Sequence, residues 1–188
     1  MTITPLSFWF LRHGETDWNA RSLSQGNVDI PLNARGVAQA EAAAKALKGQ
    51  GISTIIHSPL GRARHTAEIV SAELGLPLAV DEDLRESAFG SHEGQPMAEW
   101  FAEWIEERFT PPGGEPFGDL RLRAVDAVNR ALVEPPAVLL IGHGAFWRAI
   151  RSVIGLPANV RTPNATPLFV EPPGQGEGAW RLTVVSPD

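Results

Sequence analysis

Three times along this chain, a short apolar run ends at polar residues beside a glycine and gives way to a loop and a helical pattern. The runs are Ser7–Leu11 before Arg12-His13-Gly14, Ile52–Ile56 before His57 and Gly61-Arg62, and Val138–Ile141 before Gly142-His143-Gly144. Continuous apolar runs of this length are typical of strands buried on both faces of a parallel sheet. The repetition therefore predicts an α/β fold in which crossover helices cover the sheet.

Helical periodicity fills much of the chain between these runs. After Asn33, a candidate N-cap, the residues Val37, Ala40, Ala44 and Leu47 recur at helical spacing. Further helices are expected over Ala63–Leu74, around Trp100 and Trp104, over Phe117–Leu132 and over Ala145–Ile154. A short edge strand is expected over Leu78–Val80, and a loop over residues 15–33. Near the C-terminus we expect an antiparallel hairpin of Pro167–Val170 and Trp180–Val185, with its turn at Gly174–Gly178. We therefore expect a three-layer α/β/α sandwich with a mainly parallel, mixed central sheet.

The length of the chain sets the number of cores that it can build. With 188 residues, of which 43% are apolar, the chain can bury one sizeable core. We expect a single domain over residues 1–188, with a small helical lid at about 95–116. The segment 110–116, rich in proline and glycine, is interpreted as a rigid loop, because the chain on either side is too short for two cores.

Charge and cysteine content exclude several classes of function. A net charge of −6, from 16 basic and 22 acidic residues, argues against a broad surface for nucleic acid or for an anionic membrane. The chain has no cysteine, which excludes disulfides and a thiolate nucleophile. Residues 1–7 lack the features of a signal peptide and no run reaches membrane-spanning length, so we expect a cytoplasmic protein. We expect it to be either a monomer or a homodimer.

The polar residues that follow the three apolar runs should meet at one place. Ordinary right-handed crossovers make the three strands parallel, and their carboxyl ends then share one edge of the sheet, where open α/β sheets bind ligands. That edge would gather two guanidiniums, two imidazoles, an amide and a helix N-terminus, from Arg12, Arg62, His13, His143, Asn19 and Gly144. Such a set suits a compact oxyanion, and phosphate best. Gly14 is expected to make room for the incoming group.

The same residues predict a route for phosphoryl transfer. Without a cysteine, His13 beside Arg12 is the candidate nucleophile, because a positive surround keeps its imidazole neutral and leaves a ring nitrogen free to attack phosphorus. His143 would donate a hydrogen bond that stabilises charge in the transition state. Glu86, in the loop after the short edge strand, is the candidate acid for the leaving alkoxide.

These residues also belong to an ordered set of motifs that spans most of the chain. The motifs are Arg12-His13-Gly14-Glu15-Thr16 with Trp18-Asn19, Gln25-Gly26 with Asp29 and Pro31-Leu32, Ser58-Pro59-Leu60-Gly61-Arg62-Ala63 with Thr66-Ala67, Leu84-Arg85-Glu86 with Phe89-Gly90 and Glu93-Gly94, Gly113-Gly114-Glu115, and His143-Gly144 with Arg148-Ala149. In these motifs and in their order, the chain resembles the histidine phosphatase superfamily, in its phosphoglycerate-mutase-like branch.

The resemblance implies a function and a set of site residues. It implies a phosphomonoesterase, without a metal or another cofactor, that acts on a small phosphorylated metabolite and has no nucleic-acid or membrane partner. It implies a phosphohistidine at His13 and Glu86 as the acid and later the base. It assigns the phosphoryl group or substrate to Arg12, Arg62, His143, Asn19, Gln25, Gly26 and Gly144.

Departures from the family pattern bear on the substrate. Many relatives have tryptophan at the position of His92, serine at Pro116, serine or threonine at Gly142 and arginine at Leu23. These positions shape the pocket, so they leave the substrate open more than the reaction type. Two alternatives are a phosphoglycerate-type mutase, against which the short, acidic stretch from Gly94 to Gly113 argues, and a catalytically silent phospho-ligand or phosphoprotein binding module.

The other histidines and the tryptophan pair receive structural interpretations. A metallohydrolase is disfavoured because the five histidines show no ligand spacing such as H-E-x-x-H. His65, one turn after Arg62, is expected to orient that arginine or to cap the core, and His92 to line the mouth of the pocket; His57 has no assigned role. Trp100 and Trp104 are interpreted as core anchors of the lid helix.

Overall fold

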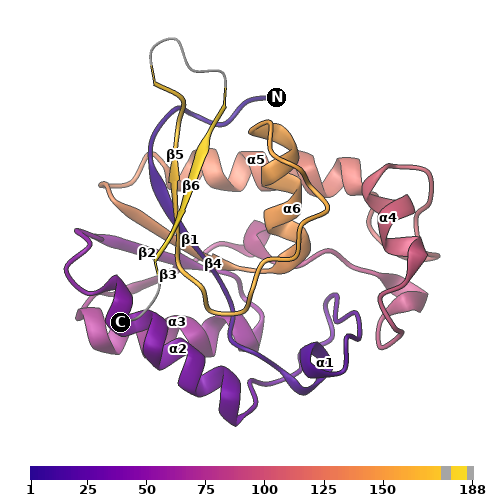
Figure 1. The fold of residues 1–188 in the computed structure, drawn as a ribbon, viewed down its shortest axis with the longest axis horizontal. Coiled ribbons are helices and arrows are strands. Elements are labelled where there is room, and N and C mark those ends of the chain that lie inside the picture. The colour runs from indigo at the N-terminus through magenta and orange to yellow at the C-terminus, as the bar shows by residue number, and fades with distance from the viewer. Residues whose placement is uncertain (175–178, 186–188) are drawn as a thin grey trace.

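A six-stranded sheet organises the protein in the computed structural model, which describes residues 1–174 and 179–185. The strands lie in the order β3-β2-β4-β1-β5-β6 (Figure 1). They are β1 (Phe8–Arg12), β2 (Thr54–His57), β3 (Leu78–Val80), β4 (Val138–Gly142), β5 (Leu168–Glu171) and β6 (Arg181–Val184). β1, β2, β3 and β4 run parallel to one another, whereas β5 pairs antiparallel with both β1 and β6. This confirms the mainly parallel, mixed sheet and the terminal hairpin, whose turn lies largely outside the described residues.

The register of the sheet brings three strand ends to one edge. Arg12 at the end of β1 pairs with Gly142 at the end of β4, and His57 at the end of β2 pairs with Ile141. The polar residues that follow these strands therefore start from neighbouring positions. This arrangement confirms the expectation that the three strand ends lie side by side.

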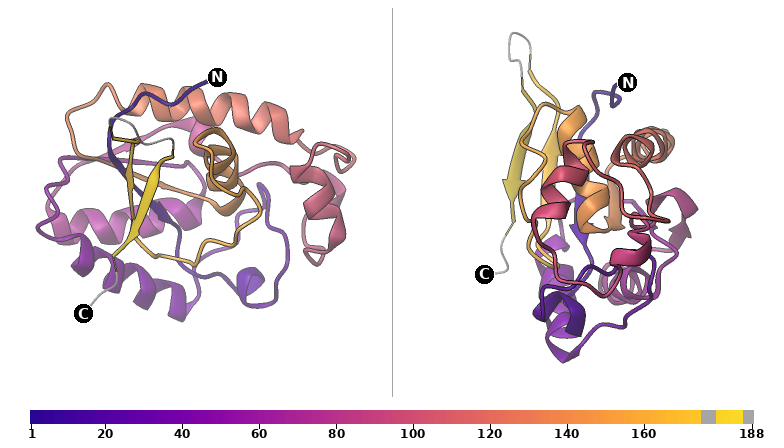
Figure 2. Two further views of the ribbon diagram at one scale, coloured as in Figure 1. Left: turned by 45° about the horizontal axis from the view of Figure 1, so that its top comes forward. Right: turned by 90° about the vertical axis from the view of Figure 1, so that its right-hand side faces the viewer.

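Helices cover both faces of the sheet (Figures 1 and 2). On one face, α2 (Ala34–Leu47) and α3 (Gly61–Leu74) share a core with Trp9 and Leu11 of β1. On the other face, α5 (Phe117–Ala131) and α6 (Gly144–Val153) share a core with Phe8 and Phe10. Alternate residues of β1 thus point into two cores, as expected of a strand buried on both sides. The three-layer α/β/α sandwich is confirmed.

Capping explains several helix boundaries. Asn33 is the N-cap of α2, since its Oδ1 accepts a hydrogen bond of 2.8 Å from the amide of Gly36. Gly75 ends α3 in the left-handed conformation with φ of 68°. The predicted loop over residues 15–33 contains one short helix, α1 (Asp17–Ala20), closed by a capping box between Thr16 and Asn19. Four residues are too few to show helical periodicity, so the sequence pattern missed it.

The segment that follows β3 carries two 3-10 turns, η1 (Glu82–Leu84) and η2 (Gly90–His92), and the short helix α4 (Glu99–Ile105). In Figures 1 and 2, α4 lies at one end of the molecule, beyond the sheet. Trp104 is fully buried and its Nε1 donates to the Glu115 carbonyl at 2.8 Å, so it anchors α4 as predicted. Trp100 is only partly buried and packs edge-on against Phe89. Among the described residues, no helix combines the length and apolar content needed to cross a membrane.

Candidate active site

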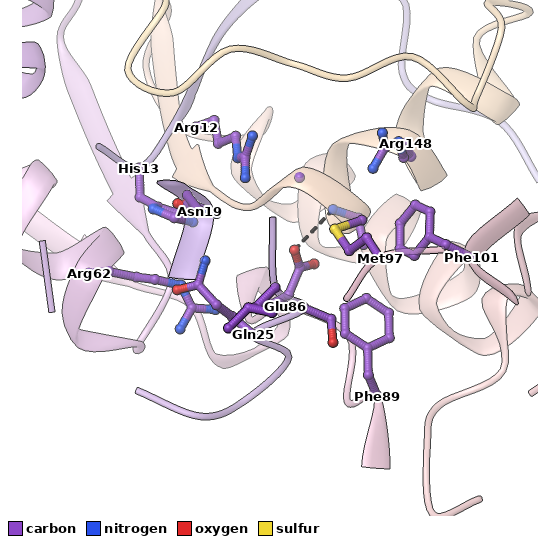
Figure 3. A pocket seen from close by; sticks show the side chains of 14 residues that line it. Arg12, His13, Asn19, Gln25, Arg62, Glu86, Phe89, Met97, Phe101 and Arg148 are labelled. Atoms are coloured by element: carbon purple, nitrogen blue, oxygen red, sulfur yellow. Dashed lines mark hydrogen bonds between the residues drawn. The ribbon is translucent and has the colours of Figure 1, made fainter. Parts of the chain in front are cut away.

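A cavity lies at the strand-end edge of the sheet (Figure 3). It is lined by Arg12, His13, Asn19, Leu23, Ser24, Gln25, Arg62, Glu86, Phe89, Met97, Phe101, Gly144, Ala145 and Arg148. Seven of the nine residues predicted from the sequence are in this lining. The other two, His143 and Gly26, lie just behind it: the ring of His143 is 5.2 Å from that of His13, and the carbonyl of Gly26 accepts a hydrogen bond from Arg62.

His13 is held as a neutral imidazole with one free nitrogen. Its side chain is 2% exposed, and its Nδ1 lies 2.7 Å from the carbonyl oxygen of Gly14. Because a carbonyl oxygen can only accept, Nδ1 carries the proton and Nε2 keeps its lone pair. Burial, followed by the charges of Arg62 and Arg12, lowers the pKa of His13 well below 6.5. A buried, unprotonated nitrogen beside two guanidiniums is suited to attack a phosphorus atom.

Gly14 has a different role from the one expected. A Cβ built on Gly14 would lie 2.3 Å from the carbonyl oxygen of Gly36, at the start of α2. The amide of Gly14 donates to Thr66 Oγ1 at 3.1 Å. The glycine therefore permits the close approach of the β1 loop to α2, and this steric need replaces our expectation that it clears space for a ligand.

Arg12 and Arg62 each use part of the guanidinium to fix the backbone. Arg12 Nη1 donates to the Thr162 carbonyl at 2.6 Å, and Arg62 donates to the carbonyls of Val28 at 2.8 Å and Gly26 at 2.7 Å. Burial lowers the pKa of Arg12 to about 10, and also lowers the pKa of Arg62, whereas Glu86 opposes both shifts. Both groups are still charged near neutral pH. Two immobilised cations in a buried cavity favour a multiply charged anion.

His143 lies directly behind His13 and is fully buried. Its Nε2 is 2.6 Å from the hydroxyl oxygen of Ser58, and its Nδ1 is buried without a hydrogen-bond partner among the described residues. Burial, Arg62 and the neighbouring His13 lower the pKa of His143 well below 6.5. The hydroxyl of Ser58 thus fixes the orientation of this second neutral imidazole.

Glu86 occupies the N-terminus of α6. Its Oε2 accepts a hydrogen bond from the amide of Ala145, and its Oε1 accepts from Phe146 and Ser87, each at 3.0 Å. The first amides of α6 therefore already bind a carboxylate, although the sequence suggested that this helix end would hold the phosphate directly. Glu86 is 8% exposed and is positioned by the helix at the wall of the cavity.

Asn19 and Gln25 are both held through their amide oxygens. Asn19 Oδ1 accepts from the Thr16 amide at 3.3 Å and from Asn164 Nδ2 at 3.1 Å, and Gln25 Oε1 accepts from Thr16 Oγ1 at 3.0 Å. This leaves the two NH₂ groups as the donors available to the cavity that both residues line. Two further donors for an oxyanion thus stand beside the arginines.

Sequence reasoning gave no separate role to Arg148, Met97 or Phe101. Figure 3 shows Arg148 and Phe101 across the pocket from His13 and Arg62. Arg148 follows Gly144 by four residues on α6, so the two share a helix face, and this spacing could have identified it. Met97 and Phe101 enter from the α4 segment, whose distance from the strand ends in the sequence gave no local signal.

One histidine prediction is wrong, and another is wrong in part. His65 does not cap the core: it is exposed on α3, beside a surface hollow that Asp29 and Glu68 also line. His92 does not line the mouth of the cavity: its ring packs against Trp100 at 4.8 Å and Phe109 at 5.5 Å. Over residues 1–174 and 179–185, no group of three or more histidine, cysteine or acidic side chains has a geometry that could hold a metal ion.

Comparisons with known proteins place this fold and site in one family. The model of the histidine phosphatase superfamily (branch 1) matches residues 8–164, so the chain belongs to that superfamily. The uncharacterized phosphatase PhoE of Bacillus subtilis is 36% identical over 146 residues, which cover 77% of this chain and 75% of PhoE. The probable phosphoglycerate mutase GpmB of Yersinia pestis is 35% identical over 166 residues, covering 82% of this chain and 77% of GpmB.

Solved structures agree with this assignment. A mycobacterial glucosyl-3-phosphoglycerate phosphatase complexed with VO3 superposes with a TM-score of 0.81 and 30% identity, covering 97% of this chain and 99% of that one. The alpha-ribazole phosphatase of Shigella flexneri gives a TM-score of 0.78 and 26% identity, with 96% of each chain covered. Similar proteins thus include phosphatases that are named for different substrates, together with a probable mutase.

Proposed function

We propose that the protein is a metal-independent phosphomonoesterase that acts on a small phosphorylated metabolite through a covalent phosphohistidine on His13. One observation carries the proposal: the unprotonated Nε2 of a neutral, buried His13 stands in a cavity with Arg12 and Arg62. Phosphatases among the similar proteins support the same reaction class.

In the first step, His13 Nε2 attacks phosphorus, the N–P bond forms and the bond to the ester oxygen breaks. Glu86 gives its proton to the leaving alkoxide, so the products are a free alcohol, a carboxylate and the phosphorylated histidine. Arg12 and Arg62 hold the phosphoryl oxygens, and the side-chain NH₂ groups of Asn19 and Gln25 are further donors to them.

In the second step, water replaces the alcohol. Glu86, now a carboxylate, accepts a proton from the water as its oxygen attacks phosphorus and the N–P bond breaks. His13 returns to the neutral state, Glu86 is protonated again, and phosphate leaves. His143 lies behind His13, where Ser58 holds its ring in place. Its role in this proposal is to stabilise the charge of the transition state. Gly26 contributes by fixing Arg62 through its carbonyl.

We also propose that the segment at about 95–116 acts as a lid within a single domain. Met97 and Phe101 from this segment line the cavity, while Trp104 anchors the segment to the core. A lid of apolar side chains would exclude bulk water during the first step and so protect the reaction from competing proton transfers.

A mutase is the second candidate, because GpmB is a probable phosphoglycerate mutase. In a mutase the same phosphohistidine would return its phosphoryl group to a hydroxyl of the substrate instead of to water. The stretch from Gly94 to Gly113 is short and acidic, unlike the longer insertion that the family resemblance leads us to expect of a mutase, and this favours hydrolysis.

The test is phosphate release from an aryl phosphate in the presence of a chelator. We expect turnover by the wild type, loss of turnover in His13→Ala, and retention in His65→Ala, which removes an exposed histidine outside the cavity. Release that survives in His13→Ala would contradict the proposal. Transfer of the phosphoryl group from one phosphoglycerate hydroxyl to another, at a rate above release, would favour the mutase, and binding without either reaction would favour a silent binding module.

A further inference from the structure

A second cavity of about 210 Å³ adjoins the phosphoryl pocket. The two cavities share Arg12, Asn19, Met97 and Arg148, and the second adds Ser22 and Arg161. Arg148 thus lies between the place for a phosphoryl group and a further space that the proposed chemistry does not use. A group attached to the substrate alcohol could enter this space.

Arg148 is buried, and it forms no ion pair within the part of the chain that the structure describes. It is 9% exposed, and its Nε is buried without a hydrogen-bond partner among the described residues. The guanidinium carbon lies 4.8 Å from the centre of the Phe101 ring, which supports the cation without neutralising it. Burial lowers the pKa of Arg148 to about 10, with Glu86 opposing the shift. A buried, charged guanidinium with an unused donor is costly in the empty protein and favours a ligand oxygen.

Arg161 is brought to the same cavity by a loop tied to the phosphoryl site. Arg12 Nη1 donates to the Thr162 carbonyl at 2.6 Å, and the amide of Ala165 donates to the Arg12 carbonyl at 2.9 Å. Asn164 Nδ2 donates to the His13 carbonyl at 3.0 Å. These contacts fix the loop against the end of β1, so Arg161, although exposed, is anchored at the rim of the second cavity.

The charges around the two cavities are out of balance. After burial, both Arg148 and Arg161 lower the pKa of Arg12, which means that these cations repel one another. Glu86 is the one carboxylate that opposes the shift of Arg12. Asp29 and Glu93 join Glu86 in raising the pKa of Arg62, whereas at Arg12 and Arg148 only Glu86 does so among the described residues. Positive charge is therefore least balanced on the side of Arg148 and Arg161.

We propose that Arg148 and Arg161 form a second anion subsite, so that the substrate is a phosphate monoester whose alcohol carries a further anionic group, either a carboxylate or a second phosphate. The inference rests on the proposed function for the position of the reacting phosphoryl group. Arginine forks suit both groups, because each presents two oxygens to parallel N–H donors. The size of the cavity fits a compact group better than a protein chain.

Three probes of equal chain length test the subsite: 2-hydroxyethyl phosphate, phosphoglycolate and ethylene glycol bisphosphate. We expect the wild type to show a kcat/KM at least about tenfold higher for one of the two anionic probes than for the neutral one, as charge-assisted hydrogen bonds imply. The probe that gains identifies the second group as carboxylate or phosphate. A three-carbon series of the same design tests a longer separation between the phosphoryl group and the second anionic group.

Variants of Arg148 and Arg161 test whether these two residues cause the preference for the anionic probe. Arg148→Met keeps the packing on Phe101 without the charge, and Arg161→Ala removes the rim cation; each should reduce the preference for the anionic probe by about tenfold. Arg148→Lys should restore part of it. Arg64→Ala is the matched control, since Arg64 is exposed on α3 and pairs with Glu68. An unchanged preference in both Arg148→Met and Arg161→Ala would overturn the subsite.

Binding of phosphonates separates this inference from the proposed function. Phosphonoacetate and ethylphosphonate carry a phosphorus group that cannot be hydrolysed, and their affinities for the wild type can be measured by calorimetry. Tighter binding of phosphonoacetate that is lost in Arg148→Met, without hydrolysis of any probe, would support the subsite and overturn the phosphatase. Hydrolysis of all three phosphates at equal kcat/KM, with equal affinity for the two phosphonates, would overturn the subsite and leave the phosphatase standing.

Discussion

The floor and the outer wall of the cavity are built in different ways. The floor consists of Arg12, His13 and Arg62, with His143 behind them, and these residues lie at or after the ends of β1, β2 and β4. The outer wall consists of Met97, Arg148 and Arg161. His13 is 2% exposed and Arg62 1% exposed, whereas Met97 is 41% exposed. The floor is locked by neighbouring backbone, so its side chains have little freedom to change without disturbing the fold. Met97 and Arg161, the exposed part of the outer wall, can change at little cost, and we infer that the outer wall selects the substrate.

The largest expected effect concerns Glu86, which links the two regions by binding the start of α6 from the side of the floor. Glu86→Gln keeps most of the shape but cannot transfer the proton, so turnover of an alkyl phosphate should fall by about 10²–10⁴-fold. With an aryl phosphate, whose leaving group needs no acid, one burst of aryl alcohol per enzyme should precede a slow phase. The measurement is stopped-flow release of the alcohol, with Glu99→Gln, at an exposed carboxylate on α4, as control. A burst of alcohol from the alkyl phosphate as fast as that from the aryl phosphate would contradict the acid role.

A smaller effect is expected behind the floor, at Ser58. Ser58→Ala removes the 2.6 Å contact with His143 Nε2 and leaves this buried imidazole without its fixed orientation. Loss of one such hydrogen bond should lower kcat about tenfold while KM changes little. The control is Ser91→Ala, at an exposed serine beside His92. A change confined to KM would indicate that Ser58 affects substrate binding instead of the position of His143.

How much of this arrangement could be predicted from sequence differs between the same two regions. Apolar runs that stop at Arg12, at His57 before Arg62 and at Gly142 before His143 show strand ends, and parallel crossovers bring them together. The hydrogen bonds that complete the site join residues far apart in the chain, such as Asn164 to His13 and Arg12 to Thr162. No local pattern marks such a hydrogen bond, because the loop residues have no periodicity and their partners are set by the packed fold.

Glu86 illustrates an intermediate case. Its motif predicted a role as an acid. Its hydrogen bonds from the amides of Ala145 and Phe146, however, depend on where α6 starts relative to the loop after β3. The sequence showed a helix N-terminus and a carboxylate separately. Only the fold shows that the carboxylate binds that helix end.

The lowered pKa values of His13 and His143 predict that the protein becomes less stable in acid. Burial and the nearby arginines lower the pKa of His13 and His143 well below 6.5, so both take up protons on unfolding when the pH falls below that value. The unfolded state then binds more protons than the folded state, and the free energy of unfolding decreases as the pH falls from 6.5 toward the lowered pKa values. Urea midpoints at pH 7.5 and 5.5 measure this, and His13→Phe should lessen the decrease. NMR signals of His13 that show a protonated ring at pH 6 would contradict the account.

The smallest expected effect is at the exposed part of the outer wall. Met97→Ala shortens an apolar side chain that both cavities share, so KM should rise a few-fold, about the effect of losing part of one apolar contact, with kcat and the free energy of unfolding little changed. Steady-state kinetics with an aryl phosphate measure it, and Val133→Ala, at an exposed apolar side chain outside both cavities, is the control. A large loss of kcat would show that the wall takes part in the chemistry.

Trapping the covalent intermediate tests the central claim most directly. Glu86→Gln, mixed with an aryl phosphate and quenched in base within the burst, should carry one phosphoryl group on His13 by peptide mass mapping, and the adduct should be stable to base and labile to acid. The double variant His13→Ala/Glu86→Gln should carry none. Turnover by the wild type without any phosphoryl adduct on His13, or an adduct on another residue, would contradict the account.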